Sequence, residues 1–83
     1  MKKPIVLIEW RDAAGGTRAG WRPMRDVERQ ETADCYSVGF LIRSNKNEVL
    51  VVPHVATLDG QCDGDAELCI PKSWVKKITV LRK

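Results

Sequence analysis

The sequence predicts an all-β protein, a small SH3-like or Sm-like five-stranded barrel with a long loop or short helix between its first two strands. Three observations support this class. Apolar runs of strand length recur along the chain, turn-forming residues separate them, and one segment alone shows helical spacing. The 83 residues suit one domain, residues 1–83, and at this size folding buries only about 60–65% of the surface that the unfolded chain exposes. A homo-oligomer is therefore expected, because association covers edges and faces that a small sheet leaves open.

The first strand is expected at residues 4–10, PIVLIEW, because the run is β-branched and apolar. Strand alternation places Val6, Ile8 and Trp10 on one face. The opposite face also carries apolar residues, so both faces should be covered. Residues 12–17 contain two glycines and should form a flexible turn.

The next segment is expected to be mostly loop. Trp21 should close one end of the core, and Pro23 restricts the residue before it to extended geometry. Within residues 24–34, Met24 and Val27 give an apolar face only two residues wide, so we expect at most a turn or two of helix. A long loop on a small barrel is a natural place for binding residues.

Residues 35–56 predict a β-hairpin at the centre of the fold. Two apolar strands flank a polar turn at residues 43–48. Pro53 interrupts the second strand and lacks a main-chain donor, which indicates an edge position, a bulge or a bend. Residues 57–65 hold two glycines and several acids and are expected to form an exposed loop.

The last part of the chain predicts a short strand at residues 66–70, one 3₁₀ turn at residues 71–75 and a final strand at residues 76–83. Small SH3-like and Sm-like barrels commonly close in this way. Five short strands with little helix favour a barrel over a sandwich.

The overall charge is mildly basic. Fourteen Lys and Arg against eleven Asp and Glu give a formal charge of +3, well below that of a dedicated nucleic-acid arm. The basic residues form two clusters along the sequence and the acidic residues form one. An anionic ligand would bind at the basic clusters. The simpler alternative is that all three clusters are solvated surface. The clusters are Arg11, Arg18, Arg22, Arg25 and Arg29; Lys72, Lys76, Lys77, Arg82 and Lys83; and Asp59, Asp63, Asp65 and Glu67.

The sequence indicates a cytoplasmic location without membrane attachment. The MKKP start lacks the apolar run of a signal peptide, and no stretch approaches the roughly 20 apolar residues of a membrane helix. The three cysteines are an odd set, which favours free thiols in a reducing compartment.

Metal binding, catalysis and cofactor binding are not expected. Cys35, His54, Cys62 and Cys69 could supply a Cys₃His zinc site, but there is no C-x-x-C spacing and Cys69 lies in an apolar strand, where a buried thiol is usual. His54 is the sole histidine; it could pair with a cysteine or with Ser37, yet no local pattern resembles an activated nucleophile. Walker and G-x-G-x-x-G sequences are absent.

The remaining candidate binding residues are aromatic and cationic. Aromatic rings stack on bases while guanidinium and ammonium groups hold phosphates, which is the combination that nucleotide and single-strand binders use. Trp10 and at least one other tryptophan could instead belong to the core. The predicted ligand-binding residues are Trp21, Arg22, Arg25, Lys72 and Trp74.

Several short motifs are spread along the chain: Trp10-x-Asp12, Gly20-Trp21, the strand from Ser37 to Leu41, and Ile70-Pro71-Lys72 followed by Ile78 and Leu81. Together they resemble the motifs of small uncharacterised phage-encoded proteins. The similarity spans most of the chain, which departs from the pattern in its arginine-rich segment 22–29 and in its acidic segment.

The resemblance implies a phage origin. Phage proteins of this size include sponges, non-enzymatic oligomers that sequester cyclic-nucleotide or ADP-ribose-derived signals of bacterial anti-phage defence. A chain of this type would act in the cytoplasm of the infected host and bind a compact anionic ligand. The alternative is a nucleic-acid-binding or virion-associated accessory protein.

Overall fold

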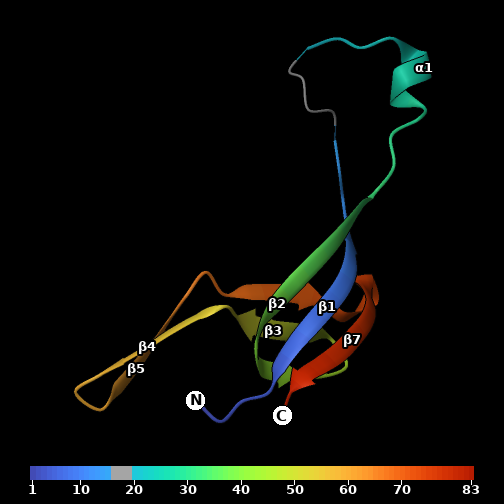
Figure 1. Ribbon diagram of the computed structural model, residues 1–83. Helices are drawn as coiled ribbons and strands as arrows, with labels where there is room; N and C mark the ends of the chain where they lie inside the picture. Colours follow the sequence, from blue (N-terminus) through green and yellow to red (C-terminus); the bar gives the residue numbers. More distant parts are fainter. Residues whose placement is uncertain (16–19) are drawn as a thin grey trace.

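A computed structural model describes residues 1–15 and 20–83 of the chain, and these residues form a nearly all-β fold (Figure 1). Five strands make one antiparallel sheet in the order β6-β3-β2-β1-β7, and β4 and β5 make a separate two-stranded sheet. The elements are β1 (Ile5–Asp12), α1 (Met24–Val27), β2 (Ala33–Ser44), β3 (Glu48–Val52), β4 (His54–Leu58), β5 (Gln61–Asp65), β6 (Leu68–Pro71), the 3₁₀ turn η1 (Lys72–Trp74) and β7 (Val75–Arg82).

The predicted all-β class and the five-stranded sheet are confirmed, and so is the 3₁₀ turn before the last strand. The last strand, β7, joins the larger sheet by pairing with β1. The sheets are not closed into a barrel, however, since β6 and β7 are both edge strands of the larger sheet in the described part of the chain.

The β2–β3 hairpin forms as predicted because its polar turn is held by one side chain. The main-chain N–H groups of Asn47 and Glu48 donate to Asn45 Oδ1 at 2.8 and 2.9 Å. The N–H of Asn45 donates in turn to the carbonyl oxygen of Glu48 at 3.0 Å. These bonds give the main-chain N–H groups of the turn local partners and fix where the two strands begin to pair.

The core is a small aliphatic cluster between β1, β3 and β6. Its members, Val6, Ile8, Val49, Val51 and Ile70, are each at most 2% exposed. Strand alternation explains this, because Val6 and Ile8 share one face of β1.

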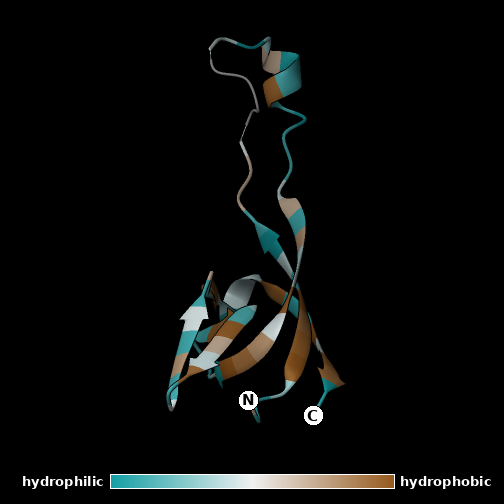
Figure 2. Ribbon diagram, turned by 60° about the vertical axis from the view of Figure 1, so that its left-hand side comes forward, coloured by the Kyte–Doolittle hydropathy of each residue, from teal (hydrophilic) through white to brown (hydrophobic). Residues whose placement is uncertain are grey.

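The opposite face of β1 is covered only in part, which corrects the expectation that both faces are covered. Ile5 and Leu7 are half-buried, and Leu7 lies opposite Val38, which is exposed. The reason is that no element of the described chain packs over that face of the sheet; α1, the only α-helix described, lies elsewhere (Figures 1 and 2).

Pro53 marks a bend between β3 and β4, as predicted, and the segment after it differs from prediction. Residues 57–65 are exposed, yet most of them belong to the β4–β5 hairpin rather than to a loop. Asp59 and Gly60 both adopt positive φ at the hairpin turn. An Asp-Gly pair favours such turns, so the sequence carried a hairpin signal that the loop prediction missed.

An extension between β1 and β2 carries α1 away from the sheets (Figures 1 and 2). A long loop with a single short helix is what the sequence predicts. The prediction that Trp21 closes the core is wrong: Trp21 is 104% exposed, because the extension holds it away from the sheets. The extension makes the molecule elongated, with principal extents of 55 × 25 × 21 Å.

The helices of the described chain are short, and none of them has the length and apolar character to cross a membrane.

Candidate ligand-binding site

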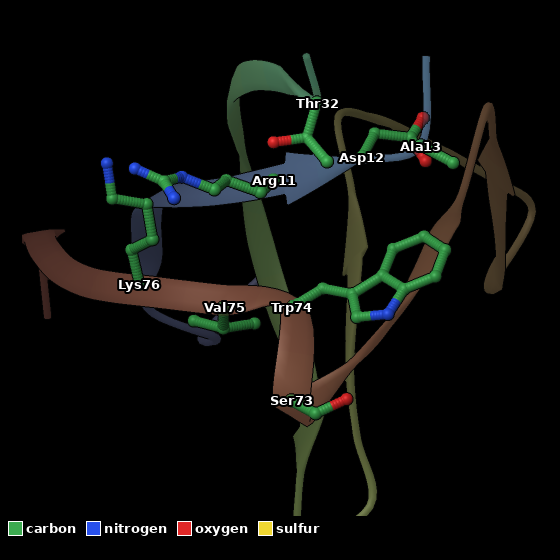
Figure 3. A pocket seen from close by; sticks show the side chains of 8 residues that line it. All are labelled: Arg11, Asp12, Ala13, Thr32, Ser73, Trp74, Val75 and Lys76. Carbon is green, nitrogen blue, oxygen red and sulfur yellow. The ribbon is translucent and has the colours of Figure 1, made fainter. Parts of the chain in front are cut away.

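A surface hollow of about 550 Å³ lies beside η1, between the end of β1 and the start of β7 (Figure 3). Three segments that are distant in sequence meet there because β1 is the sheet neighbour of both β2 and β7. The lining residues are Arg11, Asp12, Ala13, Thr32, Ser73, Trp74, Val75 and Lys76.

Trp74 forms an aromatic wall of the hollow and is held in place by Trp10. The two rings are stacked, with centroids 6.5 Å apart and planes inclined by 11°. Trp10 is itself fixed, since its Nε1–H donates to Ser37 Oγ at 3.0 Å on β2. Trp74 remains 41% exposed, so part of a rigidly placed indole is available to a ligand.

The 3₁₀ turn that presents Trp74 is attached to the β2–β3 turn. The main-chain N–H of Lys72 donates to the carbonyl oxygen of Asn47 at 2.8 Å, and Lys72 Nζ donates to Ser44 Oγ at 3.0 Å. These contacts fix the position of η1 relative to the central hairpin, and with it the wall of the hollow.

Two cations reach the hollow from neighbouring strands and share one carboxylate. Asp34 Oδ1 lies 3.2 Å from Arg11 Nε and 3.8 Å from Lys76 Nζ. Arg11 and Asp34 are direct partners in the β1–β2 register. All three side chains are about half exposed, so the cations can turn toward a stronger anion.

A bulge in β7 explains how Lys76 reaches this place. Glu9 pairs with Lys77 while the next residue, Trp10, pairs with Val75, which leaves Lys76 as the extra residue between two pairs. Residues at bulges are released from strict alternation, and their side chains are redirected. In Figure 3, Lys76 and Arg11 extend toward the same end of the hollow.

The five residues predicted from sequence do not form one site. Trp74 lines the hollow, and Lys72 lies on the same turn but is bonded to Ser44. Trp21, Arg22 and Arg25 lie on the extension around α1, away from the hollow.

The two predicted binding arginines of the extension, Arg22 and Arg25, make mainly local contacts. Arg22 donates to Gln30 Oε1 at 3.5 Å and to the carbonyl oxygen of Asp26 at 3.3 Å. Arg25 Nε lies 3.9 Å from Asp26 Oδ1. The extension is therefore a second exposed aromatic and cationic surface, separate from the hollow.

Sequence reasoning missed Arg11, Lys76 and Thr32 as site residues. Arg11 and Lys76 stood out only as members of the two basic clusters. What joins them is the pairing of β1 with both β2 and β7, which depends on contacts between residues far apart in the chain.

The cysteines and His54 are scattered in the fold. Cys62 and Cys69 are exposed and Cys35 is half-buried, and the described residues contain no group of three or more potential metal ligands. The expectation that Cys69 is buried is wrong, because strand alternation turns it outward while its neighbour Ile70 enters the core. His54 is exposed opposite Asp65.

No protein-family model matches the chain, and no curated protein or solved structure is significantly similar to it. Its function is therefore argued from the geometry of the hollow and of the extension.

Proposed function

We propose that this chain is a non-enzymatic binding protein that sequesters a compact anionic nucleotide, of the cyclic-nucleotide or ADP-ribose-derived class that signals in bacterial anti-phage defence. The observation that carries the proposal is the hollow beside η1, which a fixed indole lines on one side and Arg11 and Lys76 line on the other (Figure 3). A base stacks on Trp74 while phosphate oxygens meet the two cations.

The size and chemistry of the hollow support a small ligand. Its volume of about 550 Å³ is in the range of about 300–1,000 Å³ that small-molecule sites occupy. The hydroxyls of Ser73 and Thr32 add polar groups at its rim, and Arg11 can bind two phosphate oxygens at once. Sequestration requires stacking, charge and hydrogen bonding, and it requires no catalytic group.

The phage-like motifs support the biological setting of the proposal. A viral protein that removes an immune signal acts in the cytoplasm of the infected host, where the signal is made. The three cysteines are free thiols, in keeping with a reducing compartment.

Replacing Trp74 with alanine is expected to weaken nucleotide binding by roughly 5- to 150-fold, because stacking of one base contributes about 1–3 kcal/mol. Trp74→Phe should retain part of the affinity, since an aromatic face remains. Isothermal titration calorimetry and native mass spectrometry, with a panel of cyclic dinucleotides, cyclic ADP-ribose isomers and short oligonucleotides, measure the effect and show whether the ligand is recovered unchanged.

Trp21→Ala is the matched control, because it removes an equal ring from the extension and leaves the hollow intact. The proposal is contradicted if the wild-type chain binds no small nucleotide of the panel. It is also contradicted if the ligand is converted, or if Trp21→Ala weakens binding as much as Trp74→Ala does.

Replacing Asp34 with asparagine is expected to strengthen binding of an anion by about 1.4- to 5-fold. The carboxylate competes with the ligand for Arg11 and Lys76, and exposed ion pairs of this kind contribute about 0.2–1 kcal/mol. The same titrations measure it, and Asp26→Asn is the control, since Asp26 pairs with Arg25 on the extension. Weaker binding by Asp34→Asn would mean that Asp34 itself contacts the ligand.

A second candidate function, nucleic-acid binding, is favoured by the extension alone. Trp21 is fully exposed there beside Arg22, and Arg25 follows in α1. In this case affinity would rise with oligonucleotide length and fall steeply with salt, because each neutralised phosphate releases counterions. Trp21→Ala would then weaken oligonucleotide binding more than Trp74→Ala does. The same set of variants therefore distinguishes the two functions.

A further inference from the structure

Besides the outer edge of β6, the described chain leaves the edges of β7 and of the β4–β5 hairpin unpaired. β7 is the last strand of the five-stranded sheet, and the two-stranded β4–β5 hairpin is not joined to that sheet. Figure 1 shows the hairpin projecting from the molecule on the side away from β7. An unpaired edge carries main-chain donors and acceptors that can pair with another strand.

The hairpin has little packing of its own. All five residues of β5 are exposed, and Val55 is the one residue of β4 that is partly buried. Isolated two-stranded hairpins are only marginally stable in water, so a hairpin of this kind gains most from a partner strand.

The two edges carry opposite charges. Residues 59–67, which include β5, contain four acids and no lysine or arginine. Residues 72–83, which include β7, contain five cations and no acid. The acids are Asp59, Asp63, Asp65 and Glu67, and the cations are Lys72, Lys76, Lys77, Arg82 and Lys83.

Contacts within one molecule leave this complementarity unused. Within residues 1–15 and 20–83, no acid of the hairpin segment forms an ion pair, and Lys76 is the one cation of β7 that does, with Asp34. Both edges also expose apolar side chains, Leu58 at the end of β4 and Val80 and Leu81 on β7. A second copy of the same chain offers each edge a surface of opposite charge.

We propose that the β4–β5 hairpin of one copy docks against the free edge of β7 of a second copy. Main-chain pairing between the edges provides the affinity, and acids facing lysines select this partner over a second hairpin or a second β7. Lys76 lies both on β7 and beside the hollow, but the variants that test the docking leave it unchanged, so the inference is tested apart from the nucleotide proposal.

The contact joins two different surfaces, so it is heterologous. Each copy offers its hairpin to one neighbour and its β7 to another, and association continues until the assembly closes as a ring or grows as a filament. A two-fold dimer is not the product of such a contact.

Two charge-reversed variants test the proposal. One carries Lys77→Glu and Lys83→Glu and loses the basic edge; the other carries Asp63→Lys and Glu67→Lys and loses the acidic edge. A control with Lys2→Glu and Lys46→Glu changes the net charge as the first variant does, at exposed residues outside both edges. Circular dichroism confirms folding, and native mass spectrometry with sedimentation velocity measures the assembly.

We expect wild type and control to assemble and each variant to be monomeric at the same concentration. An equimolar mixture of the two variants should recover association, since the acidic hairpin of the first variant can dock on the basic β7 of the second. The proposal is overturned if wild type is monomeric throughout, if either variant assembles like wild type, or if the mixture stays monomeric.

A measurement on the wild-type chain covers the case in which a variant does not fold. Amide hydrogen exchange is compared in concentrated and dilute solution. Docking predicts that amides of β5 and β7 gain protection on concentration while those of the β2–β3 turn do not. Equal exchange at both concentrations contradicts the proposal.

Discussion

Ile8→Ala is expected to lower the free energy of unfolding by about 2–5 kcal/mol. Ile8 is fully buried and belongs to the core cluster with aliphatic side chains of β1, β3 and β6. Truncation removes apolar contacts and leaves a cavity that a rigid sheet cannot fill by collapse. The free energy of unfolding of a protein domain is typically only about 5–15 kcal/mol, so this loss is a large share of it.

Urea denaturation followed by tryptophan fluorescence measures this loss, because Trp10 packs against the core cluster. Ile8→Val is the graded control and should cost about 0.5–1.5 kcal/mol. Val80→Ala, at an exposed position on β7, should change stability by about 0.5 kcal/mol or less. A loss from Ile8→Ala no larger than that from Val80→Ala would show that the cluster is not the core.

Gly39→Ala is expected to destabilise the fold by about 1–3 kcal/mol through overpacking. A Cβ at this position would lie 2.9 Å from the carbonyl oxygen of Val52 and 3.0 Å from its carbonyl carbon. The obstacle is main chain, just before the bend at Pro53, so a rotamer change cannot relieve the clash. β2 and β3 must separate locally, which weakens the hairpin at the centre of the sheet.

Thermal unfolding by circular dichroism measures the effect of Gly39→Ala. Gly15→Ala is the matched control, since a Cβ at Gly15 would meet no atom within 4 Å. If the two variants unfolded at the same temperature, the close approach of β2 to the end of β3 would be refuted.

The parts of the fold that were predictable from sequence are those fixed by neighbouring residues. Asn45 closes the β2–β3 turn with its own side chain, and Pro71 precedes the 3₁₀ turn that leads into β7. Asp59-Gly60 belongs to the same group, although its hairpin was predicted as a loop. Each of these signals acts over a few residues, so the sequence displays it directly.

The candidate site was less predictable because its residues meet through strand pairing. Arg11 and Asp34 are 23 residues apart and become neighbours through the β1–β2 register. Among the predicted binding residues, Trp74 alone lines the hollow. Whether Trp21 was buried depended on where the extension points, which no local pattern specifies.

Because of the bulge, the side chain at position 76 can change without altering the strand pairing of the sheet. Lys76 has no partner in the β1–β7 register, so a different side chain there leaves the pairs on either side unchanged. A substitution at Arg11, by contrast, alters a position paired with Asp34. An engineered change of the charge beside the hollow therefore disturbs the sheet least at position 76.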